Sequence, residues 1–174
     1  MHESQKASKQ VQQVVKKTNC ILAFIAKRLE FKNREVLLQL FRVLVRPHLE
    51  YCGQFWSPFL KKDLVTLEAV QGGFIRLIPG MRGLSYQERL NSLGLYSLEF
   101  RRVRGDLIQT YQILRELDRV DGEMFSLVGE SQTRAHNYKI KGQSFKTEVR
   151  RNLFSQRVVN LWILCPKGPR RLDH

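Results

Sequence analysis

The amino-acid sequence predicts a mainly α-helical protein: a bundle of four to six helices, with a small β-hairpin or an extended basic arm near the C-terminus. Two observations support this prediction. Apolar residues recur with a period near 3.6 over residues 7–117, and the strict alternation typical of β-strands is missing there. The chain has 174 residues and 43% hydrophobic content, which is enough for a buried core.

The first element is predicted to be an amphipathic helix over residues 7–29. Basic residues stand between apolar ones that follow helical spacing. The apolar set is Val11, Val14, Val15, Ile21, Leu22, Ile25 and Leu29.

A second helix is expected to begin after Asn33, which is a favourable N-cap. Paired apolar positions from Val36 to Val45 predict a wide buried stripe on it. Pro47 is expected to kink or restart this helix. An aromatic-rich stretch then runs to Ser57, which is expected to cap the next helix.

That next helix is predicted over residues 59–78, and it ends at a Pro-Gly pair. Two glycines, Gly72 and Gly73, stand inside it against their helix propensity. The large aromatic residues of the chain are expected to form the core, as is usual in small helical proteins. They are Phe41, Phe55, Trp56, Phe74, Phe100 and Trp162.

Capping signals define the following helices. Ser85 and Glu88 form a capping box, and Gly94 is expected to end that short helix. Ser97 is expected to cap a longer helix. Its apolar residues recur every three or four positions and form a stripe that suits packing against another helix. The stripe consists of Phe100, Val103, Leu107, Tyr111 and Leu114.

Beyond residue 118 the helical pattern stops. Residues 119–133 have no periodic apolar set and predict a loop, and two alternating stretches about Gly142 predict a hairpin or an extended arm. Helical spacing returns over residues 153–164. The predicted organisation is therefore a helical bundle (1–118), a loop (119–133), a basic arm with a terminal helix (134–164) and a disordered tail (165–174).

The chain is strongly basic. Thirty Lys and Arg against 16 Asp and Glu give a net charge of +14, which attracts polyanions. Residues 1–56 carry +6 (10 basic minus 4 acidic) and residues 134–157 also carry +6 (7 minus 1), whereas residues 84–118 balance at zero (5 minus 5). RNA or DNA is therefore the expected partner. The balanced stretch, residues 84–118, is expected to be structural scaffold. Its arginines Arg101, Arg102 and Arg104 are expected to pair locally with Glu99 and Asp106.

Cysteine use and hydropathy indicate the compartment. Cys20, Cys52 and Cys165 are an odd number without CxxC spacing, which argues against a disulfide framework and a zinc site. The N-terminus is polar and no apolar run is long enough to span a bilayer. We expect an intracellular protein, nuclear or cytoplasmic and not secreted, without stable membrane insertion.

No catalytic or cofactor-binding constellation is predicted. Two-metal catalysis requires converging carboxylates, but no Asp-Asp pair occurs in the sequence. His48 and Cys52 are four residues apart, yet two ligands do not make a metal site. We expect no enzyme activity from this chain on its own, no metal and no cofactor.

The candidate nucleic-acid-binding residues form two groups. In the first, cations alternate with aromatic residues, which offers charge to phosphates and stacking surfaces to bases; the alternative is a solvated arm whose aromatics tuck into the bundle. It comprises Arg134, Tyr138, Lys139, Lys141, Lys146, Arg150, Arg151 and Arg157, with Phe145 and Phe154. The second group lies on the first helix and comprises Lys16 and Lys17, with Lys27 and Arg28; a plain solvated face is the alternative.

Four segments carry a family resemblance: residues 44–64 (LVRPHLEYCGQFWSPFLKKDL), 67–80 (LEAVQGGFIRLIPG), 84–108 (LSYQERLNSLGLYSLEFRRVRGDLI) and 128–136 (VGESQTRAH). In this order and spacing they resemble the C-terminal part of reverse transcriptases from LINE or jockey-like, non-LTR retrotransposons. The resemblance spans roughly residues 7–162. It implies a thumb and post-thumb region that holds template and primer. In the parent RNA-directed DNA polymerase, this region lies beside the palm domain.

The sequence departs from the family pattern at two places. Gly72 and Gly73 stand where the family usually has a basic pair, and Leu161-Trp-Ile-Leu-Cys-Pro166 stands where it usually has Trp-Asn-x-Leu-Pro. Besides a nucleic-acid-binding fragment of such a polymerase, two alternatives stay open. One is a basic helical module for an acidic protein or an anionic membrane surface, and the other is a translated pseudogene without a function.

Overall fold

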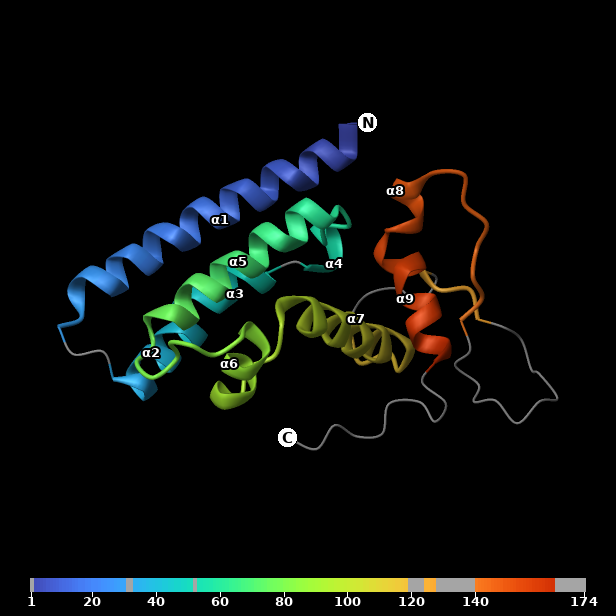
Figure 1. Ribbon diagram of the computed structural model, residues 1–174. Helices are drawn as coiled ribbons and strands as arrows, with labels where there is room; N and C mark the ends of the chain where they lie inside the picture. Colours follow the sequence, from blue (N-terminus) through green and yellow to red (C-terminus); the bar gives the residue numbers. More distant parts are fainter. Residues whose placement is uncertain (1, 31–32, 52, 119–123, 128–139, 165–174) are drawn as a thin grey trace. The chain divides into compact units, whose positions relative to one another are not determined.

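The structure is a computed structural model that describes residues 2–30, 33–51, 53–118, 124–127 and 140–164, with side chains except those of residues 2–6 and 56. It is mainly helical, as predicted (Figure 1). The elements are α1 (His2–Arg28), α2 (Arg34–Leu40), the π-helix η1 (Phe41–Val45), α3 (Arg46–Glu50), α4 (Gly53–Trp56), α5 (Lys61–Leu77), α6 (Tyr86–Leu93), α7 (Leu98–Leu114), α8 (Glu148–Arg151) and α9 (Phe154–Ile163).

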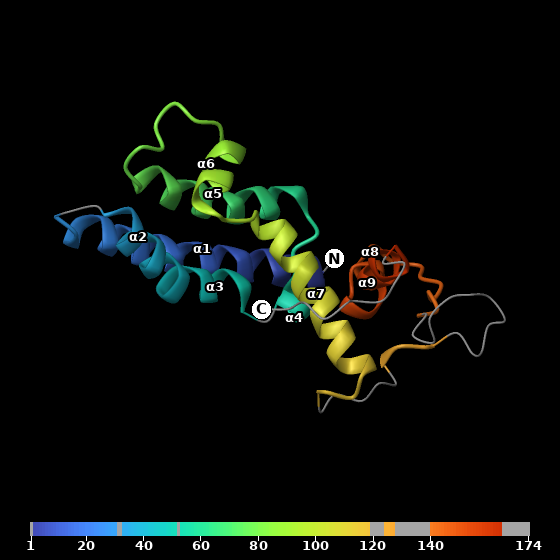
Figure 2. The same ribbon diagram turned by 90° about the horizontal axis from the view of Figure 1, so that it is seen from below.

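The chain divides into two compact units, Met1–Arg102 and Val103–His174, and the division falls inside α7. In the first unit, α1 lies alongside α5 and the α2–η1–α3 segment (Figures 1 and 2). The predicted amphipathic character of α1 is confirmed, because Val11, Leu22 and Ile25 are buried while the opposite face is exposed. Thr18 is also buried, and its hydroxyl donates a hydrogen bond to the Val14 carbonyl at 2.6 Å.

The second predicted helix begins as expected, with the Asn33 side chain accepting a hydrogen bond from the Glu35 amide at 2.8 Å. It then passes through the π-turn η1, and α3 restarts with Pro47 in its first turn. Pro47 has no amide proton, so a change of hydrogen-bond register just before it is physically expected.

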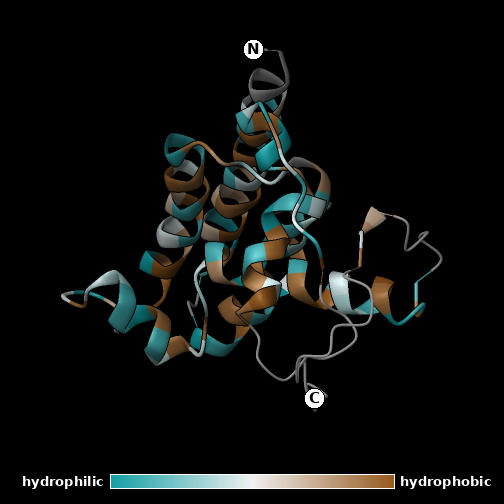
Figure 3. Cartoon of the chain, turned by 90° about the vertical axis from the view of Figure 1, so that its right-hand side faces the viewer, coloured by the Kyte–Doolittle hydropathy of each residue, from teal (hydrophilic) through white to brown (hydrophobic). Residues whose placement is uncertain are grey.

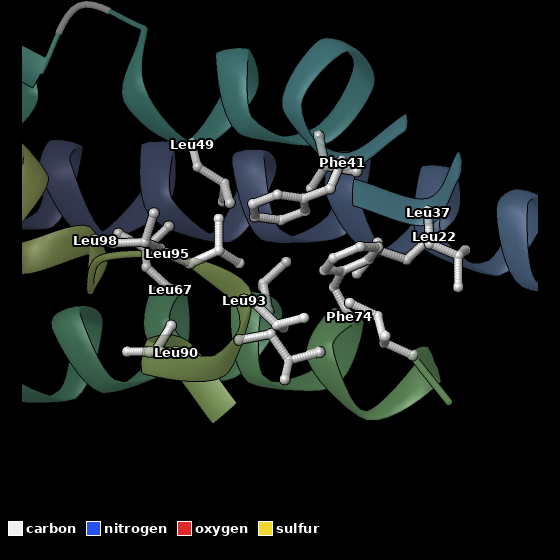
Figure 4. Packing of buried hydrophobic residues seen from close by; sticks show 14 of the residues in the cluster. Leu22, Leu37, Phe41, Leu49, Leu67, Phe74, Leu90, Leu93, Leu95 and Leu98 are labelled. Atoms are coloured by element: carbon white, nitrogen blue, oxygen red, sulfur yellow. The ribbon is translucent and has the colours of Figure 1, made fainter. Parts of the chain in front are cut away.

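The core of the first unit is built around two stacked rings. Phe41 and Phe74 have centroids 4.4 Å apart and planes inclined by 17° (Figure 4). Both rings are fully buried, and leucines from α1, α2, α3, α5 and α6 surround them. In Figure 3 hydrophobic and hydrophilic residues alternate within single helices, as this one-sided burial requires.

Helix α5 begins later than predicted. Ser57 does not cap it; the N-cap position is Leu60, which makes no side-chain capping bond. The first turn instead contains the buried Asp63, whose carboxylate accepts a hydrogen bond from the Ser8 hydroxyl of α1 at 2.6 Å. A carboxylate near a helix N-terminus is stabilised by the helix dipole, which compensates for the missing cap.

The predicted caps of α6 and α7 are confirmed. Ser85 and Glu88 form the complete capping box, Gly94 ends α6 in the left-handed conformation, and Ser97 accepts a hydrogen bond from the Phe100 amide at 3.2 Å. Hydrogen bonds from the side chain and the backbone of Ser85 lower the pKa of the Glu88 carboxyl.

A polar network joins α5 to the start of α6 and α7. The Tyr86 hydroxyl donates to Glu68, which also accepts a hydrogen bond from the Leu98 amide at 3.1 Å. Gln71 donates to the Tyr86 hydroxyl at 3.1 Å and to the Tyr96 carbonyl at 3.0 Å. The pKa of Tyr86 is raised above its ordinary value. Burial of the hydroxyl is the larger cause, and the hydrogen bond with Glu68 is the second.

The second unit has a smaller core that joins the later turns of α7 to α9. Ile113, Val158 and Trp162 are buried there with Phe125 and Ile140. The stripe predicted on α7 is only partly correct. Leu107, Tyr111 and Leu114 pack against this core while half-buried, and the fully buried line consists of Asp106, Thr110 and Ile113.

The hairpin alternative is not found in residues 140–149. Ile140 forms an isolated antiparallel bridge with Leu127, residues 141–145 have no regular secondary structure, and Thr147 caps the short helix α8. Thr147 accepts a hydrogen bond from the Arg150 amide, which starts a helical turn where a second strand was expected. The predicted loop (119–133) and tail (165–174) lie largely outside the described residues.

Two of the six predicted core aromatics are not buried. Phe55 is 91% exposed on α4 and Phe100 is 51% exposed, stacked on Tyr96 at 5.0 Å. A helix at the surface of a bundle buries only one side, and at the start of α7 that side carries Leu98 rather than Phe100. Phe41, Phe74 and Trp162 are buried as predicted, and the Trp56 side chain lies outside the described residues.

Candidate nucleic-acid interface

The outer face of α1 carries the first group of candidate cations in the described part of the chain. Lys16 and Lys17 are exposed, and Lys27 and Arg28 are exposed about three turns further on. Because Val11, Thr18, Leu22 and Ile25 form the buried face, the lysines project from the opposite side of the helix.

Lys9 joins this face, although the sequence analysis did not single it out. It is exposed and lies seven residues, or two turns, before Lys16. Helical spacing from Lys16 was the signal that would have identified it. Residues 7–28 contain five basic and no acidic residues, so no carboxylate of α1 itself offsets this charge. We name the set Lys9, Lys16, Lys17, Lys27 and Arg28 the α1 basic face.

Two arginines elsewhere in the first unit, Arg46 and Arg101, pair with a carboxylate. Glu50 of α3 pairs with Arg46 at 3.2 Å and with Arg101, whose Nη2 lies 3.0 Å from the second carboxylate oxygen. The prediction that Arg101 pairs locally is therefore wrong in its partner, because the partner lies 51 residues away. Arg101 thereby links α7 to α3, whereas Arg46 pairs within α3. Among the described residues no salt bridge involves the α1 basic face.

The basic arm supplies the second group. Lys141, Lys146, Arg150 and Arg151 are all exposed, and the Phe145 ring is 43% exposed between them. Glu148 is the one acidic residue among the described positions 140–157. Arg134, Tyr138 and Lys139, the other predicted members, lie outside the described residues.

Arg157 does not share this exposure. Its side chain is 17% exposed, its Nε lies 2.8 Å from Oδ2 of the buried Asp106, and its Nη1 donates to the Asn152 carbonyl at 3.2 Å. The guanidinium also lies 5.7 Å from the centroid of the Phe154 ring. Its donors are thus directed to protein groups, and we leave Arg157 out of the candidate interface.

Potential metal ligands do not gather in the described residues. No group of three or more His, Cys, Asp or Glu residues that could hold an ion occurs among them. His48 is half-buried in α3, and Cys52 lies outside the described residues. None of the described helices combines the length and the apolar character that crossing a bilayer requires.

Comparison with known proteins adds no family assignment to this geometry. No family model, no curated protein and no solved structure matches the chain.

Proposed function

We propose that this chain is a nucleic-acid-binding fragment of a retrotransposon RNA-directed DNA polymerase, one that lacks the palm active site and holds RNA or DNA without extending it. The observation that carries the proposal is the α1 basic face. Five exposed cations lie along one helix whose residues 7–28 contain no acid. The family resemblance of residues 7–162 supports the same proposal.

The dimensions of α1 suit a polyanion. Lys9 and Arg28 are 19 residues apart, which corresponds to about 28 Å along a helix. One strand of a nucleic acid carries a phosphate about every 3.4 Å of a duplex axis, so several phosphates come within reach of this face. Because the lysines are long and flexible, they favour phosphates in any sequence, and we expect little sequence preference.

The test is a salt titration of binding to RNA, to DNA and to anionic vesicles. If the α1 basic face neutralises about five phosphates, the logarithm of affinity falls with the logarithm of salt with a slope of about −3.5 for single strands and −4.5 for duplexes. Lys16→Gln combined with Lys17→Gln reduces the steepness by about 1.4 to 1.8, because two contacts are lost.

A matched control is available on α5. Lys61 and Lys62 are also adjacent, exposed lysines on a helix, so Lys61→Gln with Lys62→Gln removes the same charge from another element. The proposal expects the α1 pair to matter more than the α5 pair. Equal losses would mean that net charge alone attracts the ligand, and preference for vesicles over nucleic acid would favour the membrane-surface alternative.

A further inference from the structure

The face of α1 also carries an exposed aromatic ring, Phe24. Its side chain is 61% exposed, while its neighbours Leu22 and Ile25 are buried in the core. Phe24 therefore lies on the solvent side of a helix that already has a complete buried stripe.

One cation contacts this ring, and two more lie before and after it along α1. The guanidinium carbon of Arg28, one turn later, lies 5.6 Å from the ring centroid, which is a cation–π contact. Lys17 and Lys27 are exposed two turns before and one turn after Phe24. The nearest exposed residues on the same side, Cys20 and Ala23, have short side chains that leave the ring accessible.

We propose that Phe24 and these cations form a base-stacking site for single-stranded nucleic acid on the outer face of α1. This inference rests on the proposed function and states which form of nucleic acid the face prefers. An aromatic ring next to cations binds an unpaired base by stacking while the cations bind the adjoining phosphates. A duplex offers the phosphates but keeps its base faces covered by neighbouring base pairs, so it gains nothing from the ring.

The experiment measures binding of the full chain to three probes of equal length: a single-stranded oligonucleotide, the same strand in a duplex, and a single strand with abasic sites. Phe24→Leu keeps an apolar side chain but removes the stacking face. We expect it to weaken binding to the base-bearing single strand by at least about fivefold. Binding to the duplex and to the abasic strand, and the salt slope on each, should stay the same.

Two further variants make the result specific. Phe55→Leu changes a ring that is 91% exposed on α4, and it should not alter any of the three affinities. Phe24→Trp restores a stacking face and should preserve binding to the single strand. Because Phe24 is exposed, neither change at this position should shift the melting temperature, which circular dichroism checks.

Several outcomes would overturn the inference. They are an unchanged single-strand affinity of Phe24→Leu, an equal loss on the abasic strand or the duplex, and a loss on anionic vesicles in place of the single strand. If Lys16→Gln with Lys17→Gln weakens all three probes while Phe24→Leu weakens none, the proposed function survives without the stacking site. If the wild-type chain binds none of the probes, the proposed function itself fails.

Discussion

Arg157 of α9 and Asp106 of α7 form an ion pair with two hydrogen bonds, Nε–Oδ2 at 2.8 Å and Nη2–Oδ1 at 2.9 Å. The side chain of Asp106 is 8% exposed. The pair links two residues that are 51 positions apart across the core of the second unit. It engages Arg157, which was predicted from the sequence to be one of the nucleic-acid-binding cations of the basic arm.

Removing the cation from this pair should destabilise the second unit. Arg157→Ala leaves the buried Asp106 carboxylate without its partner, and we expect a loss of about 3 kcal/mol in the free energy of unfolding. Urea unfolding followed by circular dichroism measures it. Arg150→Ala, which removes an exposed arginine of α8, serves as control and should change stability by no more than about 0.5 kcal/mol. Equal midpoints for both variants would contradict a structural role for Arg157.

The two glycines of α5 should respond differently to substitution. From the sequence, replacing both with Arg is expected to recover about 1–2 kcal/mol of helix propensity. In the structure, a Cβ at Gly73 meets nothing within 4 Å, whereas one at Gly72 lies 3.7 Å from the Tyr86 ring. We therefore expect Gly73→Ala and Gly73→Arg each to stabilise by about 0.5–1 kcal/mol.

At Gly72 the size of the new side chain decides the sign. Gly72→Ala adds an ordinary contact with Tyr86 and should also stabilise, but Gly72→Arg places a long cation at a buried position and should lower the denaturant midpoint. If Gly72→Arg stabilises as much as Gly73→Arg, the packing against Tyr86 does not limit this position.

Tyr86 predicts a loss of stability at alkaline pH. Its pKa in the folded protein is raised, so the folded state keeps a proton that the unfolded state releases above about pH 10. The contribution of Tyr86 is full below that pH and is lost as pH rises further, by up to about 1.4 kcal/mol per pH unit. Urea unfolding between pH 9 and 11 should show a steeper decline for the wild type than for Tyr86→Phe. Parallel declines would remove Tyr86 as the cause.

The basic arm should add to nucleic-acid binding independently of α1. Lys141→Gln with Lys146→Gln removes two exposed cations and should reduce the steepness of the salt dependence by about 1.4 to 1.8. Combined with Lys16→Gln and Lys17→Gln, the losses should add, because separate phosphate contacts are independent. A combined variant no weaker than either pair would mean that the two surfaces do not hold the same molecule.

Much of the candidate interface follows from sequence alone. The exposure of Lys16 and Lys17 was predictable, because lysines between apolar residues at helical spacing lie on the solvent side. Lys141 and Lys146 were expected to be exposed because they stand in a strongly basic stretch, and such charge runs usually face solvent. Phe24 was not singled out, although helical spacing from Val11, Leu22 and Ile25 already places it on the opposite face of the helix.

The sequence by itself determined the helical class and the local signals that start and stop the helices, such as Asn33, the Ser85–Glu88 box and Gly94. These are contacts within a few residues, so local composition suffices to predict them. The tertiary structure alone decided that Glu50 binds Arg101, that Asp106 binds Arg157, and that Phe55 is exposed. Such pairings join distant residues, and they depend on how helix faces pack rather than on any spacing along the chain.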